Sequence, residues 1–313
     1  MNRAAMHPMK RKKASVLFAQ RYLYLMLLPA VLFLFVFWYV PIFGWLIAFI
    51  NYKPGFKLFP AEWTGLLQFR SFFTDSKDFI YLLRNTLAMN IGSLIANLGA
   101  AFVFALLLNE IRYRFFGRII QSVTFFPFFI SWIIIYSLSS ALLATSSGAV
   151  NETLVQWGFI EEGVNVLGDP KYAWMFMILL GVWKYLGYNS VIFISSIASI
   201  PQDYYEAASM DGANRFQRMW HITVPALVPT LIVLLILNSG WVLNSNFEQF
   251  YLFTNSTNWE KMEVLELYIY KYGLQLLNYP YATAVGIMKT FVSLILIIMV
   301  NAIAKKATGK AIF

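Results

Sequence analysis

The sequence predicts an all-α integral membrane protein with six transmembrane helices. Hydrophobic residues make up 59% of the 313 residues and charged residues only 12%, whereas charged residues make up about a quarter of a typical soluble domain. Six long runs contain at most one lysine and no other charged residue. Each run exceeds the roughly 20 apolar residues that a helix needs to cross a bilayer. The basic residues flank these runs, so membrane orientation explains the formal charge of +9 better than nucleic-acid binding does.

The six runs, in chain order, are residues 22–52, 86–109, 119–151, 172–200, 219–247 and 272–304. An even number of spans places both termini on one side of the membrane. Lysines and arginines concentrate in three segments that this topology places on that side: Arg3, Lys10, Arg11, Lys12, Lys13 and Arg21; Arg112, Arg114 and Arg118; and Lys305, Lys306 and Lys310. Short loops rich in Lys and Arg stay in the cytoplasm. Both termini are therefore expected to be cytoplasmic.

The expected organisation is a cytoplasmic tail over residues 1–21, a transmembrane domain over 22–304 and a second tail over 305–313. The first run is too long for a signal-peptide core and lacks a small-residue cleavage site, so we interpret it as an anchor. The N-terminal tail fits a basic amphipathic helix on the anionic leaflet or a disordered topogenic segment, and both interpretations stay open. Outside the membrane, residues 52–84 predict interfacial helices, and residues 144–171 predict turns around a short helix.

The residue types leave little room for chemistry on this chain. There is no cysteine and there are only two histidines, so neither thiol catalysis nor a histidine or cysteine metal cluster is expected. Paired carboxylates inside the spans are also absent from the sequence, which argues against an intramembrane enzyme. No nucleotide-binding glycine loop with its Lys and Ser or Thr occurs. We expect no catalytic residue, no metal site and no bound cofactor.

The cytoplasmic segment 200–225 between the fourth and fifth runs has an architecture of its own. Pro201 suits a first helical position, and good helix formers follow it. Asp211 and Gly212 are expected to end this helix, with the Asp211 carboxylate capping the next one. A second helix is expected from about Asn214 to Pro225, where the fifth span would begin. The segment therefore predicts a protruding helical hairpin.

This hairpin resembles the permease subunits of binding-protein-dependent ABC importers. Their motif is Glu-Ala-Ala, three residues, Gly, nine residues, Ile, one residue and Leu-Pro. The matching positions here are Glu206, Ala207, Ala208, Gly212, Ile222 and Pro225, with Val224 in place of the leucine. The resemblance implies the type I importer fold and a coupling helix that docks on an ATPase subunit. It implies that contact for Tyr205, Glu206, Ala207, Ala208, Asp211, Gly212 and Arg215.

The same resemblance implies the partners and the location. Two ATPase subunits would bind ATP and Mg²⁺, a similar but non-identical second permease would complete the pathway, and an extracytoplasmic solute-binding protein would deliver the saccharide. The location would be the bacterial cytoplasmic (inner) membrane. WTGLLQFRSFF and LLRNTL, before the second run, resemble the sugar and oligosaccharide branch. VWKYLGYNSVIFISSIASIP is similar to permeases for complex saccharides, including the alginate and aldouronate groups.

Polar residues inside the spans mark a candidate substrate path. Ionisable residues at membrane depth are costly and face a bundle interior, water or a partner, and aromatic rings offer flat surfaces to sugars. The candidates are Lys184, Tyr188, Asn189, Trp241, Asn244, Glu248 and Lys289, with Tyr185, Asn238, Asn246 and Gln249 near them. Lysines facing the path would favour an anionic saccharide such as an alginate fragment. The same polar residues also suit interhelical hydrogen bonds, and Lys184 suits a carboxylate of another subunit.

A secondary transporter or channel is the alternative function. It would also need six spans and buried polar groups. It would have no use for an ATPase-docking hairpin, so the segment 200–225 is the feature that separates the two functions.

Overall fold

The computed structural model describes residues 20–56, 61–74 and 78–308. Almost all of the N-terminal tail and the last five residues, to which the sequence assigns tails, lie outside these ranges. Within them the chain is helical, and its β structure is a single bridge between Ile50 and Trp63. Five helical segments are long and apolar enough to span a membrane: Arg21–Phe49, Asp78–Asn109, Pro170–Ala198, Arg215–Ser239 and Tyr279–Ala302. The predicted all-α membrane fold is confirmed.

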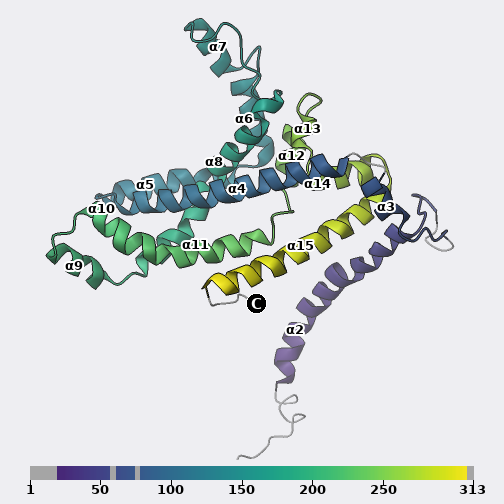
Figure 1. The fold of residues 1–313 in the computed structure, drawn as a ribbon, viewed down its shortest axis with the longest axis horizontal. Helices are drawn as coiled ribbons and strands as arrows, with labels where there is room; N and C mark the ends of the chain where they lie inside the picture. Colours follow the sequence, from purple (N-terminus) through teal and green to yellow (C-terminus); the bar gives the residue numbers. More distant parts are fainter. Residues whose placement is uncertain (1–19, 57–60, 75–77, 309–313) are drawn as a thin grey trace, which may run out of the picture.

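The centre of the molecule is a bundle of α4 (Asp78–Asn109), α8 (Pro170–Ala198), α11 (Val224–Ser239) and α15 (Tyr279–Thr308), which run roughly side by side in Figure 1. Small side chains bring α4 close to its neighbours, because Ala101 and Ala105 are fully buried against Phe193 of α8 and Leu227 of α11. Membrane helices associate through such close packing, since lipid supplies no hydrophobic force between them.

The first span stands away from this bundle. It comprises α2 (Arg21–Leu34), a π-helical turn η1 (Phe35–Tyr39) and a 3₁₀ segment η2 (Val40–Phe49). No residue of α2 is buried, and the first buried residue of this span is Ala48, which packs on α15. Figure 1 shows α2 leaving the bundle at an angle. A helix that is apolar on every side has to be covered by lipid or protein.

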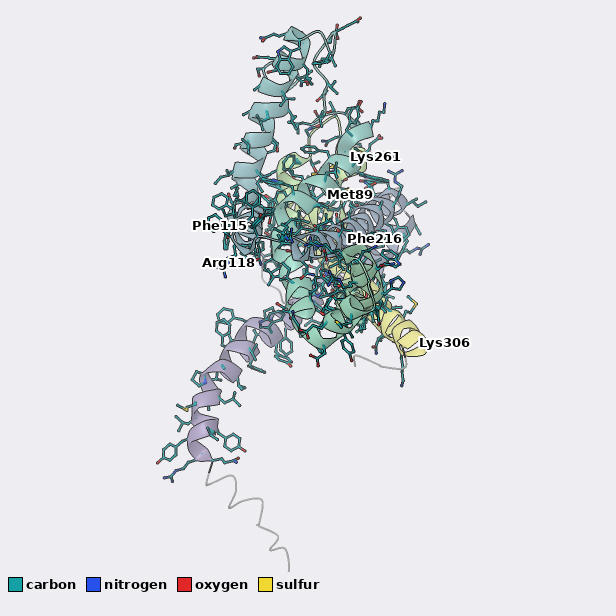
Figure 2. All side chains as sticks on the ribbon, turned by 90° about the vertical axis from the view of Figure 1, so that its left-hand side faces the viewer. Met89, Phe115, Arg118, Phe216, Lys261 and Lys306 are labelled. Atoms are coloured by element: carbon teal, nitrogen blue, oxygen red, sulfur yellow. The ribbon has the colours of Figure 1, made fainter. Side chains whose placement is uncertain are left out.

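The third predicted span is present as a bent pair of helices rather than as one continuous helix. It consists of α5 (Arg114–Phe125), a 3₁₀ turn η3 (Phe126–Phe129) and α6 (Trp132–Leu143), and the two parts meet at 101°. Pro127 lacks a backbone N–H and ends the α-helical ladder, while Ser131 caps the start of α6 through the Ile134 N–H. The short helix α7 (Ala149–Gln156) follows within the segment predicted to hold one. In both views α6 and α7 project away from the bundle (Figures 1 and 2).

Short helices cover the end of the bundle at which α4 and α15 begin (Figure 1). They are α3 (Leu67–Thr74), α12 (Phe247–Phe253), α13 (Trp259–Met262) and α14 (Leu265–Tyr270), followed by the π-helical turn η5 (Lys271–Gln275). The buried Asn85 of α4 fixes α13 and α14 by donating to the carbonyls of Glu260, at 2.8 Å, and Glu263, at 3.1 Å. The interfacial helices expected in residues 52–84 reduce to α3 and the first turns of α4.

The last two spans are shorter than the apolar runs that predict them. The fifth ends at Ser239, and the sixth begins at Tyr279. Leu277, just before Tyr279, has a φ of 56°, a left-handed conformation that interrupts a right-handed helix. The apolar runs therefore predicted which segments lie in the membrane, but not the residues at which the helices begin and end.

Candidate functional sites: the cytoplasmic hairpin and the membrane cavity

The cytoplasmic hairpin begins with α9 (Gln202–Met210), which ends as the sequence predicts. Gly212 has a φ of 77°, a conformation that side chains with a Cβ disfavour. The Gly212 N–H bonds the carbonyl of Ser209 at 3.2 Å, and the Ala213 N–H bonds that of Ala208 at 2.9 Å. This pair of bonds is the Schellman arrangement, which satisfies the free carbonyls at a helix end.

The second helix of the hairpin is capped by a different residue from the one expected. Asp211 is the C-terminal cap residue of the first helix rather than the cap of the second. The cap of α10 (Arg215–Arg218) is Asn214, which forms a reciprocal capping box with Gln217 at 2.8 and 2.9 Å. The expectation for Asp211 is therefore wrong, because a residue three positions before Gln217 has the geometry for this box and Asp211 does not.

The second helix also does not stop at Pro225. A π-helical turn, η4 (Met219–Thr223), joins α10 to α11, so that Arg215–Ser239 forms one continuous helical segment. The wider turn precedes a proline that cannot donate a ladder hydrogen bond. The hairpin is thus an extension of the fifth span, and a force on it acts directly on a membrane helix.

The residues predicted to contact an ATPase lie on two sides of this hairpin. Glu206, Ala207, Asp211, Gly212 and Arg215 are exposed. Tyr205 is half-buried, and its hydroxyl lies 2.9 Å from the hydroxyl of Thr223 in η4. Arg218 donates to the Ser209 hydroxyl at 2.7 Å, which is a second tie between the two arms. Figure 2, which views the molecule from the end carrying the hairpin, labels Phe216 of α10.

A cavity of about 360 Å³ lies between α4, α8, α11 and α12. It brings together most of the polar and aromatic residues that the sequence proposed for a path: Tyr185, Tyr188, Asn189, Asn238, Trp241, Asn244, Asn246 and Gln249. Its lining, all from the described part of the chain, contains no Asp, Glu, Lys or Arg. Amide groups supply both donors and acceptors, so this wall suits a ligand rich in hydroxyl and carboxyl oxygens.

The cavity wall is partly held by its own hydrogen bonds. Asn246 donates to the Tyr185 hydroxyl at 3.2 Å, and Asn90 donates to the Ser245 hydroxyl at 2.9 Å. The side-chain amide oxygen (Oδ1) of Asn97 is buried and has no hydrogen-bond partner among the described residues. Trp241 is 69% exposed and offers a free ring face.

Sequence reasoning missed three polar residues of this wall. Asn90, Ser93 and Asn97 of α4 line the cavity, although the second apolar run predicts only a span. The signal was present, because the three polar residues recur three and four positions apart and so share one face of a helix. Polar residues at helical spacing inside an apolar run predict a face that avoids lipid.

Three of the residues proposed for the path lie outside the cavity lining: Lys184, Glu248 and Lys289. Lys184 is only 5% exposed, and its ammonium donates to the carbonyls of Pro127, Phe128 and Ile130. Lys289 forms a 2.6 Å ion pair with Glu266 of α14. The structure therefore gives both lysines partners within the chain instead of a place on the cavity wall.

Comparisons with known proteins agree with this geometry. Residues 79–309 match the family described as "Binding-protein-dependent transport system inner membrane component". Two relatives come from Bacillus subtilis (strain 168). Protein LplB is 40% identical over 293 residues, covering 94% of this chain and 91% of LplB. The polygalacturonan/rhamnogalacturonan transport system permease protein YteP is 39% identical over 305 residues, covering 97% and 94%.

Two solved structures share the fold over nearly the whole chain. One is of a bacterial ABC transporter involved in the import of the acidic polysaccharide alginate, with a TM-score of 0.86, 32% identity, and coverage of 94% of this chain and 98% of the other. The other is of a bacterial alginate ABC transporter in complex with an alginate pentasaccharide-bound periplasmic protein. Its TM-score is 0.87 at 31% identity, with coverage of 96% and 100%.

Proposed function

Since the chain belongs to the family of binding-protein-dependent transport system inner membrane components and is a permease of a sugar ABC importer, we propose that its two sites have separate functions. The hairpin of α9 and α10 docks on an ATPase subunit, and the cavity between α4, α8 and α11 forms half of the path for an acidic oligosaccharide. The secondary transporter or channel is not favoured by the family membership.

The observation that carries the docking proposal is the exposed hairpin continuous with the fifth span. No residue of α9 is buried, so its surface is available to a partner. Ala207 leaves room for close approach, and the neighbouring Glu206 carboxylate is free to meet a basic side chain or backbone amide. Because α10 continues into α11 without a break, movement of a docked ATPase would reach the cavity wall at Asn238 and Trp241.

The partners follow from the same family membership. We propose two ATPase subunits that bind ATP and Mg²⁺, a second permease that is similar but not identical, and an extracytoplasmic binding protein. No residue of α2 is buried within the described chain, which supports a neighbouring membrane subunit against this first span. The whole assembly would lie in the bacterial inner membrane, with the hairpin on the cytoplasmic side.

The proposed cargo is an acidic oligosaccharide of the uronic-acid type. Support comes from the likeness to the importer of the acidic polysaccharide alginate and to the permease for polygalacturonan and rhamnogalacturonan. In the cavity, the amides of Asn189 and Asn244 would bond sugar oxygens, and the rings of Tyr188 and Trp241 would stack on sugar faces. Stacking and amide bonds fix orientation, while the absence of charge from this lining lets a polyanion leave again.

The docking proposal is tested by reconstituting the chain with its partner subunits. Glu206→Lys should lower ATPase retention and ATP-driven uptake together, because it reverses the charge presented at the docking surface. Asp203→Lys is the matched control, since it makes the same charge reversal at a residue that is exposed on the same helix but lies outside the motif. Uptake by the purified chain without an ATPase would overturn the proposal in favour of a secondary transporter.

The cargo proposal is tested with the same proteoliposomes. Trp241→Ala and Asn244→Ala should lower uptake of an alginate oligosaccharide, while ATPase retention stays normal. Leu237→Ala is the control, because Leu237 is exposed on α11 outside the cavity lining. Normal uptake by both cavity variants would contradict this path, and preference for neutral oligosaccharides would contradict the cargo.

A further inference from the structure

We propose that Lys184 is a positioning residue: its ammonium clamps the break between α5 and α6, and so fixes the direction of α6 and α7 and one wall of the membrane cavity. This role differs from that of a positive charge in the substrate path. It concerns the architecture of the permease and goes beyond the proposed docking and cargo.

The Lys184 ammonium has no donor left over for a further ligand. A lysine ammonium has three N–H donors and no acceptor. Lys184 reaches the carbonyls of Pro127 at 3.3 Å and Phe128 at 3.2 Å, and it also donates to the carbonyl of Ile130. Three donors meet three acceptors, and the side chain is 5% exposed. A substrate carboxylate would have to displace one of these carbonyls to bind.

The backbone carbonyls at the break need hydrogen-bond donors from elsewhere in the protein. Where a helix ends, its last carbonyls lose their intrahelical partners and carry partial negative charge. At membrane depth there is no bulk water to satisfy them. The 3₁₀ turn η3 ends α5, and the chain then bends by 101° into α6, so carbonyls at the bend face the protein interior. The Pro127 carbonyl keeps one backbone partner, the Ile130 N–H at 3.1 Å, and has a second lone pair for Lys184. A buried cation with several donors satisfies such a cluster better than a neutral side chain does.

The Lys184 ammonium contacts groups on both sides of the break. Pro127 and Phe128 lie before the bend, and the ring of Trp132, whose centroid is 5.3 Å from the ammonium, belongs to the first turn of α6. Cations are attracted to such ring faces. One ammonium from α8 therefore holds the end of one helical segment and the start of the next in a fixed relation.

The surrounding α8 residues support the same junction. A Cβ on Gly187 would lie 2.5 Å from the Phe125 nitrogen and from the Thr124 carbonyl, so backbone meets backbone there. Tyr188, which lines the cavity, stacks on Phe128 with ring centroids 4.2 Å apart and nearly parallel planes. Because Lys184 holds the Phe128 carbonyl, it also positions the Phe128 ring, on which Tyr188 of the cavity wall stacks.

Four variants separate a clamp from a charge in the path. Lys184→Arg keeps the cation and several donors, Lys184→Gln keeps two neutral donors, and Lys184→Met removes all donors at similar length. Lys171→Met is the matched control, because Lys171 is an exposed lysine of the same helix whose ammonium lies over the Tyr172 ring. The assembled transporter would be studied in nanodiscs, with cysteine-free partner subunits.

The direct readout is a distance across the bend. Since the chain has no cysteine, spin labels at Gln156→Cys in α7 and Glu260→Cys in α13 report how α7 sits relative to the bundle. We expect the wild-type, Lys184→Arg and Lys171→Met proteins to give one narrow distance distribution. Lys184→Met should broaden it or add a second distance, and Lys184→Gln should fall between them.

Uptake supplies the second readout. Lys184→Met should lower the uptake of acidic and neutral oligosaccharides by the same factor, about tenfold, which corresponds to about 1.4 kcal/mol. Lys184→Arg should restore both. If Lys184→Met protein does not accumulate, the comparison of the Gln and Arg variants carries the test.

Two results would overturn the clamp. One is an unchanged distance distribution in Lys184→Met with normal uptake. The other is an unchanged distribution with loss of acidic uptake alone, which would make Lys184 a charge in the path. The distance measurement needs neither the ATPase contact nor the saccharide to be correctly assigned, so its failure is distinct from failure of the proposed function.

Discussion

The exposed hairpin and the buried break in the third span are both places where a helix stops and the chain changes direction, yet they are built in opposite ways. In the hairpin, Gly212 and Asn214 end one helix and begin the next through bonds within a few residues. In the break, Lys184 supplies the stabilising bonds from a helix more than fifty residues away in sequence. Local signals suffice in water, but a helix end inside a membrane needs a partner from elsewhere in the chain.

This difference gives an experimental criterion. Changes at the break should lower the stability of the folded permease, because the break belongs to its packed interior. Changes in the hairpin should leave stability nearly unaltered and act on coupling to the ATPase. Four experiments test this contrast, and the one with the greatest expected cost comes first.

Gly187→Ala should have the largest effect, because the new Cβ would approach the backbone of Thr124 and Phe125 to 2.5 Å and backbone cannot rotate away. Overpacking of this kind costs about 1–3 kcal/mol, seen as a lower thermal midpoint in detergent. Gly286→Ala in α15 is the control, since nothing lies within 4 Å of its added Cβ. Equal midpoints for the two variants would show that the break is not tightly packed.

Gly212→Val should come second. The added Cβ has open space around it, so the cost, about 1–2 kcal/mol, comes only from the left-handed backbone at a φ of 77°. We expect ATP-driven uptake to fall while the thermal midpoint changes little, because the exposed turn can relieve this strain by opening locally while the packed bundle stays folded. Gly212→Asn is the control, because Asn tolerates this conformation. A midpoint lowered as much as in Gly187→Ala would erase the contrast between the two regions.

The ion pair between Lys289 and Glu266 tests an intermediate case, because both side chains are 15% exposed and join α15 to α14. Lys289→Met and Glu266→Gln should each lower the thermal midpoint, and the double variant should cost less than their sum by about 1 kcal/mol. A double-mutant cycle of thermal stability measures this coupling. Additive effects would show that the interaction between the two charges does not stabilise the protein.

Arg218→Ala should have the smallest effect. It removes one exposed hydrogen bond to Ser209, worth about 0.5 kcal/mol, while the capping box and the Gly212 turn remain. ATP-driven uptake is expected to stay within about twofold of wild type, a change of less than about 0.5 kcal/mol by the usual conversion. A larger loss would assign Arg218 to the docking contact itself, alongside the motif residues.

The predictable part of the site is the part with local causes. Gly212 was expected to turn the chain and does so, and the second hairpin helix was expected near Asn214 and begins there. The expectation for Asp211 failed because two side chains competed for one cap and only Asn214 had Gln217 in position. For the cavity, the sequence named Tyr188, Asn189, Trp241 and Asn244 but offered no way to separate them from Lys184 and Lys289.

Three features could be predicted from the amino-acid sequence alone: the chain is helical, its long apolar runs lie in a membrane, and a two-helix protrusion joins the fourth and fifth spans. Composition, run length and short-range capping decide these features. Only the tertiary structure decided that the third span bends by 101°, that Asn90, Ser93 and Asn97 join the cavity wall, and that the span lysines are already bonded within the chain. The physical reason is that a buried polar group takes its role from whichever partner folding brings to it.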